Sequence, residues 1–185
     1  SAEIESAKEE YNLGMAKALS LVDDTMTDLQ KAIVIHDYIC SKAIYPTDEK
    51  DIYHSAYGFF KDYKIVCAGY ALVYSAILKE IGIPCRYVIS NSMEHAWNAV
   101  YINGKWYNAD LTWDDTTFTT TGKNSMGTYC HIYFLKSTAD FEANKAHSDS
   151  TFPDNIECTD TSFDDAFWDS LTSNIYVYNG DYYYL

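Results

Sequence analysis

The stretch Val66-Cys67-Ala68-Gly69-Tyr70-Ala71 opens the clearest helical pattern in the chain. Residues 67–81 carry a broad apolar stripe at helical spacing, made by Tyr70, Val73, Tyr74, Ile77, Leu78 and Ile81. Gly82 and Pro84 follow as stop signals. The pattern predicts a central, largely buried helix with Cys67 at its N-terminus. A free cysteine usually behaves as a small hydrophobe, so the rest of the chain must decide whether this thiol has a chemical role.

After Pro84 the apolar period changes from that of a helix to that of a strand. Residues 85–90, 96–102 and 105–110 alternate as strands do. Asn103-Gly104 separates the last two, and both residues tolerate the positive φ of a type I′ turn. The pattern predicts an antiparallel hairpin directly after the central helix.

The hairpin register places a histidine beside an aspartate. A two-residue loop pairs residue 102 with residue 105, so His95 faces Thr112 and Asp110 faces Trp97. His95 and Asp110 then become diagonal neighbours on one face, about 7–8 Å apart at the backbone. A slip of one residue would put them on opposite faces.

These three residue types suit nucleophilic catalysis. A thiol attacks carbonyl carbon as the thiolate, which a helix N-terminus and an adjacent imidazolium both favour. His95 would supply the imidazolium, and Asp110 would orient its ring. Singly, Cys67 could be a buried helix residue, His95 a polar strand end and Asp110 a turn former. The agreement of helix start, register and residue order favours a Cys–His–Asp active site.

An acyl-transfer site also needs donors for the developing oxyanion. The backbone N–H of Cys67 is unpaired at the helix start and can supply one. The second donor is expected from the aromatic segment 45–64, which has no clear period apart from one helical turn at 56–61 and is interpreted as a substrate-facing loop. The candidates there, among which the sequence does not choose, are Tyr45, His54 and Tyr57.

The remaining chain adds helices at both sides of this core. Residues 2–21 and 28–42 are predicted as helices, the second with a Thr27/Gln30 capping box. His36 within it is interpreted as a packed, hydrogen-bonded histidine. Further predictions are an exposed loop to residue 128, a strand at 129–135, short helical segments at 140–147 and 163–171, and a hairpin around Asn179-Gly180.

Composition narrows the function classes. The net charge of −14 argues against a nucleic-acid partner, since such binding depends on Lys and Arg. No apolar run approaches the roughly 18 residues of a membrane span, and Ser1-Ala2-Glu3-Ile4-Glu5 lacks signal-peptide features. The five cysteines show neither zinc-knuckle spacing nor a disulfide framework. The 18 tyrosines suit surfaces that face carbohydrate or peptide, and they also suit ordinary strands. Their excess hints at an exported protein.

Three stretches together closely resemble the core motifs of the transglutaminase-like superfamily: Val66-Cys67-Ala68-Gly69-Tyr70-Ala71, Glu94-His95-Ala96-Trp97-Asn98-Ala99-Val100 and Trp106-Tyr107-Asn108-Ala109-Asp110-Leu111-Thr112-Trp113-Asp114. The resemblance covers residues 28–115. It implies a papain-like α+β fold, in which the helix bearing the nucleophile packs against an antiparallel sheet. It also implies a catalytic triad of Cys67, His95 and Asp110.

The resemblance leaves the domain ends open. We interpret residues 1–185 as one domain, with 116–185 as a C-terminal extension. The last hairpin belongs to that extension or begins a further module.

The resemblance does not decide whether water or an amine is the second substrate, the one that resolves the acyl-enzyme. A compact, bacterial-type core favours a secreted or surface-attached thiol protease or amidase acting on protein or peptide, including cell-wall peptide. The alternatives are an amine-dependent cross-linking transglutaminase and a catalytically silent binding domain. No cofactor or metal is expected, because Asp110, Asp114 and Asp115 lack a calcium-loop pattern and fit a solvated loop. Trp97, Trp106 and Trp113 are expected around the triad, with Trp97 as a candidate lining of the acyl-donor cleft.

Overall fold

The computed structural model describes residues 1–115, 129–148, 150–151 and 156–185. The predicted loop to residue 128 therefore lies largely outside the described residues. The elements, in chain order, are α1 (Ala2–Leu19), α2 (Asp28–Lys42), η1 (Asp51–His54), α3 (Ala56–Asp62), α4 (Cys67–Ile81), β1 (Cys85–Ser90), β2 (His95–Ile102), β3 (Lys105–Ala109), α5 (Leu111–Asp114), β4 (Phe134–Lys136), α7 (Thr138–Asn144), β5 (Ser150–Thr151), η3 (Phe167–Ser170), β6 (Tyr176–Tyr178) and β7 (Asp181–Tyr183).

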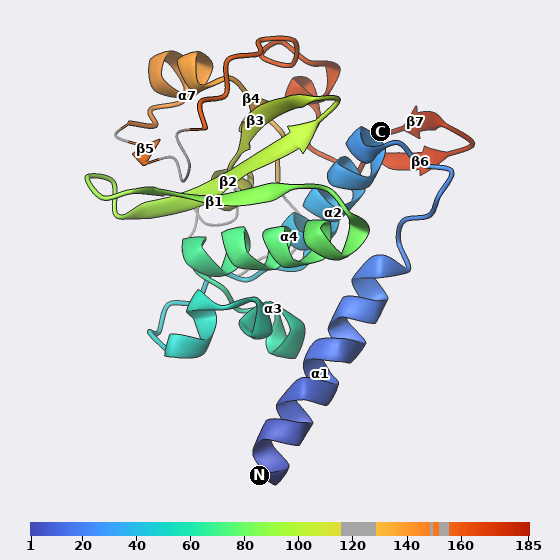
Figure 1. Ribbon diagram of the computed structural model, residues 1–185, viewed down its shortest axis with the longest axis vertical. Coiled ribbons are helices and arrows are strands. Elements are labelled where there is room, and N and C mark those ends of the chain that lie inside the picture. The colour runs from blue at the N-terminus through green and yellow to red at the C-terminus, as the bar shows by residue number, and fades with distance from the viewer. Residues whose placement is uncertain (116–128, 149, 152–155) are drawn as a thin grey trace.

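An antiparallel sheet with the strand order β4-β3-β2-β1-β5 forms the centre of the molecule. Helix α4 runs along β1 and β2, and α2 and α3 pack against α4 on the same side (Figure 1). Helix α7 lies across the sheet from α4, near β3. This arrangement confirms the predicted α+β fold, with the helix that bears Cys67 packed against an antiparallel sheet.

The predicted hairpin has the predicted register. Strand β2 pairs with β3 from Ile102↔Lys105 to Asn98↔Ala109. Asn103 and Gly104 have φ of 51° and 81°, as a type I′ turn requires. The sheet therefore brings the start of β2 and the residue after β3 to one place.

Helix α4 is the predicted central helix, with the predicted bounds. The apolar stripe from Tyr70 to Leu78 is buried against the sheet and against α2, whereas Leu72, outside the stripe, is exposed. It ends at Gly82 with φ 91°, where a left-handed residue closes the last turn. At its other end, Val66 contributes no side-chain cap, so the first N–H groups stay available to other acceptors.

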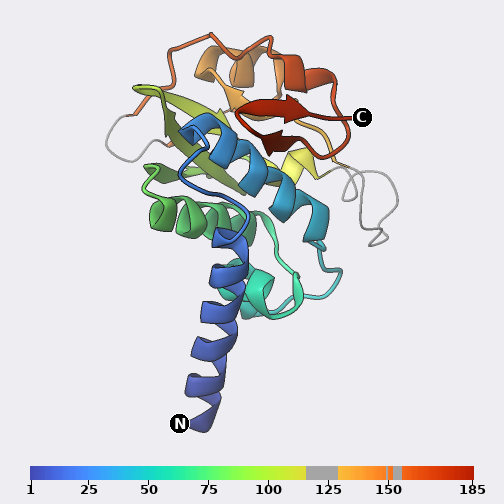
Figure 2. The same cartoon turned by 90° about the vertical axis from the view of Figure 1, so that its right-hand side faces the viewer.

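Two further predictions differ in outcome. The Thr27/Gln30 capping box is present, and the Gln30 amide also donates to the Gly180 carbonyl at 2.8 Å, which ties the C-terminal hairpin to α2 (Figure 2). The strand predicted at 129–135 is confirmed only for its last two residues, since β4 begins at Phe134 and ends at Lys136. The N–H groups of Cys130 and Tyr133 bond to the Asp114 carbonyl and carboxylate instead of to a neighbouring strand.

Other features complete the description. All five cysteines lie in the described ranges and are free thiols. Within those ranges, no helix combines the length and the apolar character that crossing a membrane requires.

A close backbone approach fixes the first turn of α4. A Cβ at Gly69 would lie 2.4 Å from the Tyr53 carbonyl oxygen and 2.7 Å from Ile65 Cβ. We expect Gly69→Ala to destabilise the fold by about 1–3 kcal/mol, because this crowding outweighs the helix propensity of alanine. Urea unfolding checks this, and a gain in stability would show that propensity dominates.

Candidate active site

Cys67 is the first residue of α4 and is half-buried. Its backbone N–H donates to the Tyr45 hydroxyl oxygen. The other thiols have a different environment, since burial raises the pKa of Cys40, Cys85 and Cys158 to about 12. Among the five thiols, Cys67 is thus the one that lies at the N-terminus of a helix without a side-chain cap.

His95 begins β2 and lies between Cys67 and an aspartate. Its Nε2 is 2.6 Å from Asp110 Oδ2, and the ring also hydrogen-bonds to the Cys67 side chain. Because Nε2 faces Asp110, Nδ1 is the nitrogen left for the thiol. Burial disfavours the imidazolium, but the charge and hydrogen bond of Asp110, with the Cys67 contact, raise the pKa of His95 to about 10.

Asp110 is fully buried at the N-cap of α5. Its Oδ1 accepts the Trp113 N–H at 3.1 Å, which fixes the carboxylate plane. Burial disfavours the charged form, but His95 and hydrogen bonds from two histidines lower the pKa of Asp110 to about 2. The structure therefore brings Cys67, His95 and Asp110 together, and the contact between His95 and Asp110 is the one that the hairpin register predicts.

His147 is a member of the site that sequence reasoning missed. Its Nε2 lies 2.8 Å from Asp110 Oδ2, the oxygen that also holds His95, and its Nδ1 lies 2.8 Å from the Lys145 carbonyl oxygen. The ring stacks on Phe141 at 4.2 Å between centroids. His147 follows α7, outside all three motifs, and nothing in its local sequence distinguishes it.

Trp97 and Trp113 pack against the rings of His95 and His147, whereas Trp106 packs on Tyr101. Trp113 stacks on His95 with centroids 5.5 Å apart. Trp97 is only 2% exposed, and its indole N–H donates to Asn108 Oδ1 at 3.0 Å. The predicted substrate contact of Trp97 is therefore wrong, because its ring is buried against His95 and His147.

Of the three candidate second donors, the structure places Tyr45 beside Cys67. Burial, followed by the nearby Cys67 and Glu49, raises the pKa of the Tyr45 hydroxyl, which keeps it protonated. The Tyr57 hydroxyl instead bonds to Glu10 at 2.5 Å. The half-exposed His54 side chain lies 3.6 Å from Glu49. Tyr57 is thus bound to α1, and His54 is paired with a residue of its own segment.

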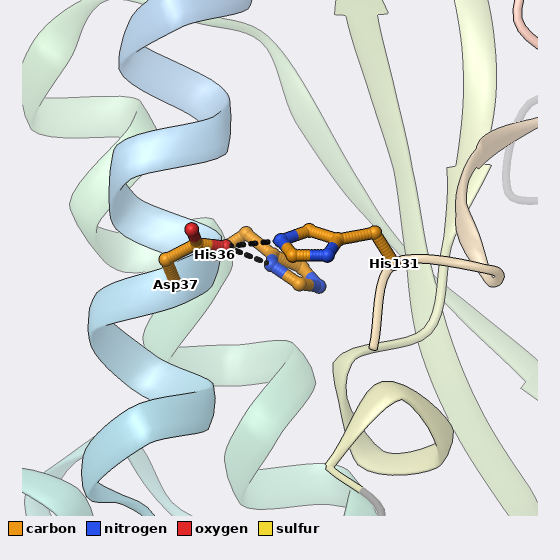
Figure 3. Close-up of side chains that lie close together, drawn as sticks. All are labelled: His36, Asp37 and His131. Carbon is orange, nitrogen blue, oxygen red and sulfur yellow. Dashed lines mark hydrogen bonds and ion pairs between the residues drawn. The ribbon is translucent and has the colours of Figure 1, made fainter. Parts of the chain in front are cut away.

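A second buried histidine cluster joins α2 to the C-terminal half (Figure 3). Asp37 Oδ1 lies 2.8 Å from His36 Nδ1 and 2.8 Å from His131 Nε2. On its other side, His36 Nε2 lies 2.9 Å from Asp114 Oδ2. The interpretation of His36 as a packed, hydrogen-bonded histidine is confirmed.

The expectation of a solvated loop at residues 114–115 is wrong. Asp114 and Asp115 are 0% and 1% exposed. Asp114 accepts bonds from His36 and the Tyr133 N–H, and Asp115 accepts the Tyr70 hydroxyl at 2.6 Å. The short helix α5 therefore links the two clusters. Asp110, at its N-cap, belongs to the candidate active site, and Asp114, its last residue, contacts His36 of the second cluster.

The chain is similar in sequence to several known proteins. The sequence profile described as "Transglutaminase-like superfamily" matches residues 16–111, which is just over half of the chain. The kyphoscoliosis peptidases of Mus musculus and Homo sapiens are each 28% identical to it over 155 residues, which cover 73% of this chain and 22% of theirs. The chain thus spans about a fifth of the length of these relatives.

A solved structure described as a TGase superposes with a TM-score of 0.46 at 16% identity, covering 68% of this chain and 35% of its own. The profile match alone covers the helix with Cys67, the strand with His95 and the position of Asp110. By that match, the chain belongs to the transglutaminase-like superfamily.

Proposed function

We propose that the protein is a thiol-dependent hydrolase or acyltransferase that cleaves peptide or amide bonds through an acyl-enzyme on Cys67. The observation that carries the proposal is the continuous hydrogen-bonded chain from Cys67 through His95 to Asp110. A nucleophile, a base and a group that orients the base are the parts that covalent acyl transfer needs.

The first half of the reaction uses the protonated form of His95. With its pKa raised to about 10, the ring is an imidazolium at neutral pH. The proposed nucleophile is the thiolate form of Cys67, paired with this imidazolium. The sulfur attacks the carbonyl carbon, a C–S bond forms, and the carbonyl electron pair moves to oxygen. When that pair returns, the C–N bond breaks and His95 gives its Nδ1 proton to the departing amine.

Two donors are available for the oxyanion. The Cys67 N–H would donate to the substrate oxygen in place of the Tyr45 hydroxyl oxygen, and the Tyr45 O–H would donate to the same substrate oxygen. Donors fixed before the reaction act without reorganisation, which is why such pairs contribute strongly to catalysis.

The second half of the reaction decides the product. Neutral His95 takes a proton from water or from a primary amine, and the oxygen or nitrogen attacks the thioester. The C–S bond breaks, and the product is an acid or a new amide. Of these outcomes we propose hydrolysis, supported by the mouse and human relatives' description as peptidases.

The test of this proposal separates the outcomes. The protein is incubated with a glutamine-containing protein and a fluorescent primary amine, and both peptide release and amine incorporation are measured. We expect cleavage or deamidation that Cys67→Ala abolishes. Incorporation of the amine at a higher rate than hydrolysis would favour the cross-linking transglutaminase. Turnover that survives Cys67→Ala would contradict the proposal, and binding without turnover would support a silent binding domain.

The His95–Asp110 pair also predicts how stability depends on pH. The raised pKa of His95 contributes stability that is complete below about pH 6.5 and is lost as the pH rises toward about 10. The lowered pKa of Asp110 contributes stability that is lost as the pH falls from about 3.8 toward about 2. Urea unfolding of the wild type and His95→Gln should show a difference that shrinks from pH 6.5 upward. A difference in unfolding free energy that stays constant with pH would contradict an ion pair between His95 and Asp110.

His147 is proposed as a positioning residue. Its bond to Asp110 Oδ2 fixes the carboxylate and takes up part of its charge. Without it, Asp110 would interact more strongly with His95. We expect His147→Gln to lower kcat/KM roughly tenfold, the worth of one hydrogen bond to a charged group, and to raise the pKa of His95 further. The pH dependence of the His95 NMR signal checks this, and lower stability with an unchanged His95 pKa would show a purely structural role.

A further inference from the structure

The cluster around Asp37 has the arrangement of a metal site. His36 Nδ1 and His131 Nε2 both face Asp37 Oδ1, and each of the three residues offers a ligand atom within 4.8 Å of the other two (Figure 3). The three residues are 0–3% exposed. Two imidazole nitrogens and a carboxylate oxygen form a donor set that first-row divalent metals such as Zn²⁺ accept.

In each of the three side chains, the polar atom that faces away from the proposed site has the partner that a metal ligand usually has. His36 Nε2 faces Asp114 Oδ2 at 2.9 Å, and His131 Nδ1 faces the Leu171 carbonyl oxygen at 2.9 Å. Asp37 Oδ2 accepts the Ile175 N–H at 2.6 Å. Metal-binding histidines donate their second N–H to a carboxylate or carbonyl in the same way, and ligating carboxylates are themselves hydrogen-bonded.

The hydrogen-bond geometry supports the same conclusion. His36 Nδ1 and His131 Nε2 converge on one carboxylate oxygen, and the two ring centroids lie 5.0 Å apart. A divalent cation bound to these two nitrogens would leave the second N–H of each ring to the oxygen acceptor that it already faces.

The geometry requires only a small expansion. Zinc bonds to nitrogen and oxygen are about 2.0–2.2 Å, so tetrahedral ligand atoms lie about 3.3 Å apart. The present contacts of 2.8 Å to Asp37 Oδ1 need to lengthen by about half an ångström. A cavity of about 390 Å³ borders Asp37, Ser41 and Ile175 and offers a route for the ion and room for a water as fourth ligand.

We propose that His36, Asp37 and His131 bind one structural divalent metal ion of the Zn²⁺ class. The ion would join α2 to the segments around residues 131 and 171–175. Because His36 also holds Asp114, the ion would fix the end of α5, the helix that Asp110 caps.

Zinc stoichiometry of the 185-residue chain tests the site. After treatment with a chelator, the protein is dialysed against buffered Zn²⁺, and bound metal and thermal unfolding are measured. We expect one tight Zn²⁺ per chain and a higher unfolding midpoint with Zn²⁺ than with chelator. Asp37→Asn and His131→Gln should lose that ion, and Asp114→Asn should weaken its binding by about 10–100-fold.

Two matched controls separate this site from the other histidines. His147→Gln alters the cluster of His95, Asp110 and His147, whose ligand atoms also converge. His54→Ala removes a half-exposed histidine. Both variants should keep the ion. Loss of zinc in His147→Gln with retention in His131→Gln would overturn the proposal.

X-ray absorption of the zinc-loaded wild type identifies the ligand atoms of the metal directly, even if a variant fails to fold. Cys40 Sγ lies 3.8 Å from His36 Nε2, on the outer side of the ring, and Cys130 contacts Asp114. We therefore expect a first shell of nitrogen and oxygen with two imidazoles and no sulfur. Sulfur in that shell, or no stoichiometric zinc in the wild type, would overturn the proposal.

Discussion

Asp110→Asn is expected to lower kcat/KM by about 10⁴-fold while the fold stays in place, as the equivalent change does in serine protease triads. Asp110 Oδ2 accepts from the Nε2 atoms of both His95 and His147. An amide nitrogen at that position cannot accept a hydrogen bond, so His95 would be turned to the tautomer with its lone pair on Nε2. Its Nδ1 would then carry a proton toward Cys67 and could not accept one.

The effect should be measured as kcat/KM on a peptide or amide substrate, with circular dichroism to confirm folding. His147→Gln is the matched control, because it touches the same oxygen without changing the His95 tautomer. Its tenfold loss should be far smaller than that of Asp110→Asn. More than a tenth of wild-type activity in Asp110→Asn would show that Asp110 does not control His95.

Asp114→Ala is expected to lower the free energy of unfolding by about 3–5 kcal/mol, the cost of removing one partner from a buried ion pair. Asp114 is 0% exposed and accepts from His36 Nε2 at 2.9 Å and from the Tyr133 N–H at 2.9 Å. Burial opposes the charge on His36, but the adjacent Cys40 sulfur, Asp114 and Asp37 raise the pKa of this ring well above its usual value. The substitution would remove one of the two carboxylates that contact the charged His36 ring.

Urea unfolding at neutral pH in the presence of chelator checks this value. Asp165→Ala, at an exposed position, is the control and should change stability by no more than about 0.5 kcal/mol. A loss below about 1 kcal/mol in Asp114→Ala would show that water replaces the carboxylate and that the cluster is less closed than its exposure indicates.

The sequence predicts the parts of the site that depend on local rules. The bounds of α4 follow from an uninterrupted apolar stripe that ends at Gly82. The contact between His95 and Asp110 follows from the Asn103-Gly104 turn, because a two-residue loop leaves only one register.

The parts that depend on distant segments could not be predicted in the same way. His147 reaches Asp110 only because α7 packs near β3, and no spacing rule links the two. Asp114 and Asp115 look solvated in sequence, since buried carboxylates need partners, and theirs are His36 and Tyr70 on two other helices. The segment 130–133 has a strand-like composition, but the N–H groups of Cys130 and Tyr133 bond to Asp114.

The central claim is that Cys67 is a nucleophile activated by His95. The most direct measurement is competition among the five thiols for a limiting peptidyl electrophile in the folded protein, with the adducts located by mass spectrometry. The account predicts one adduct, on Cys67, which His95→Ala slows strongly. Equal labelling of Cys67 and Cys85, or labelling of Cys67 at an unchanged rate in His95→Ala, would contradict it.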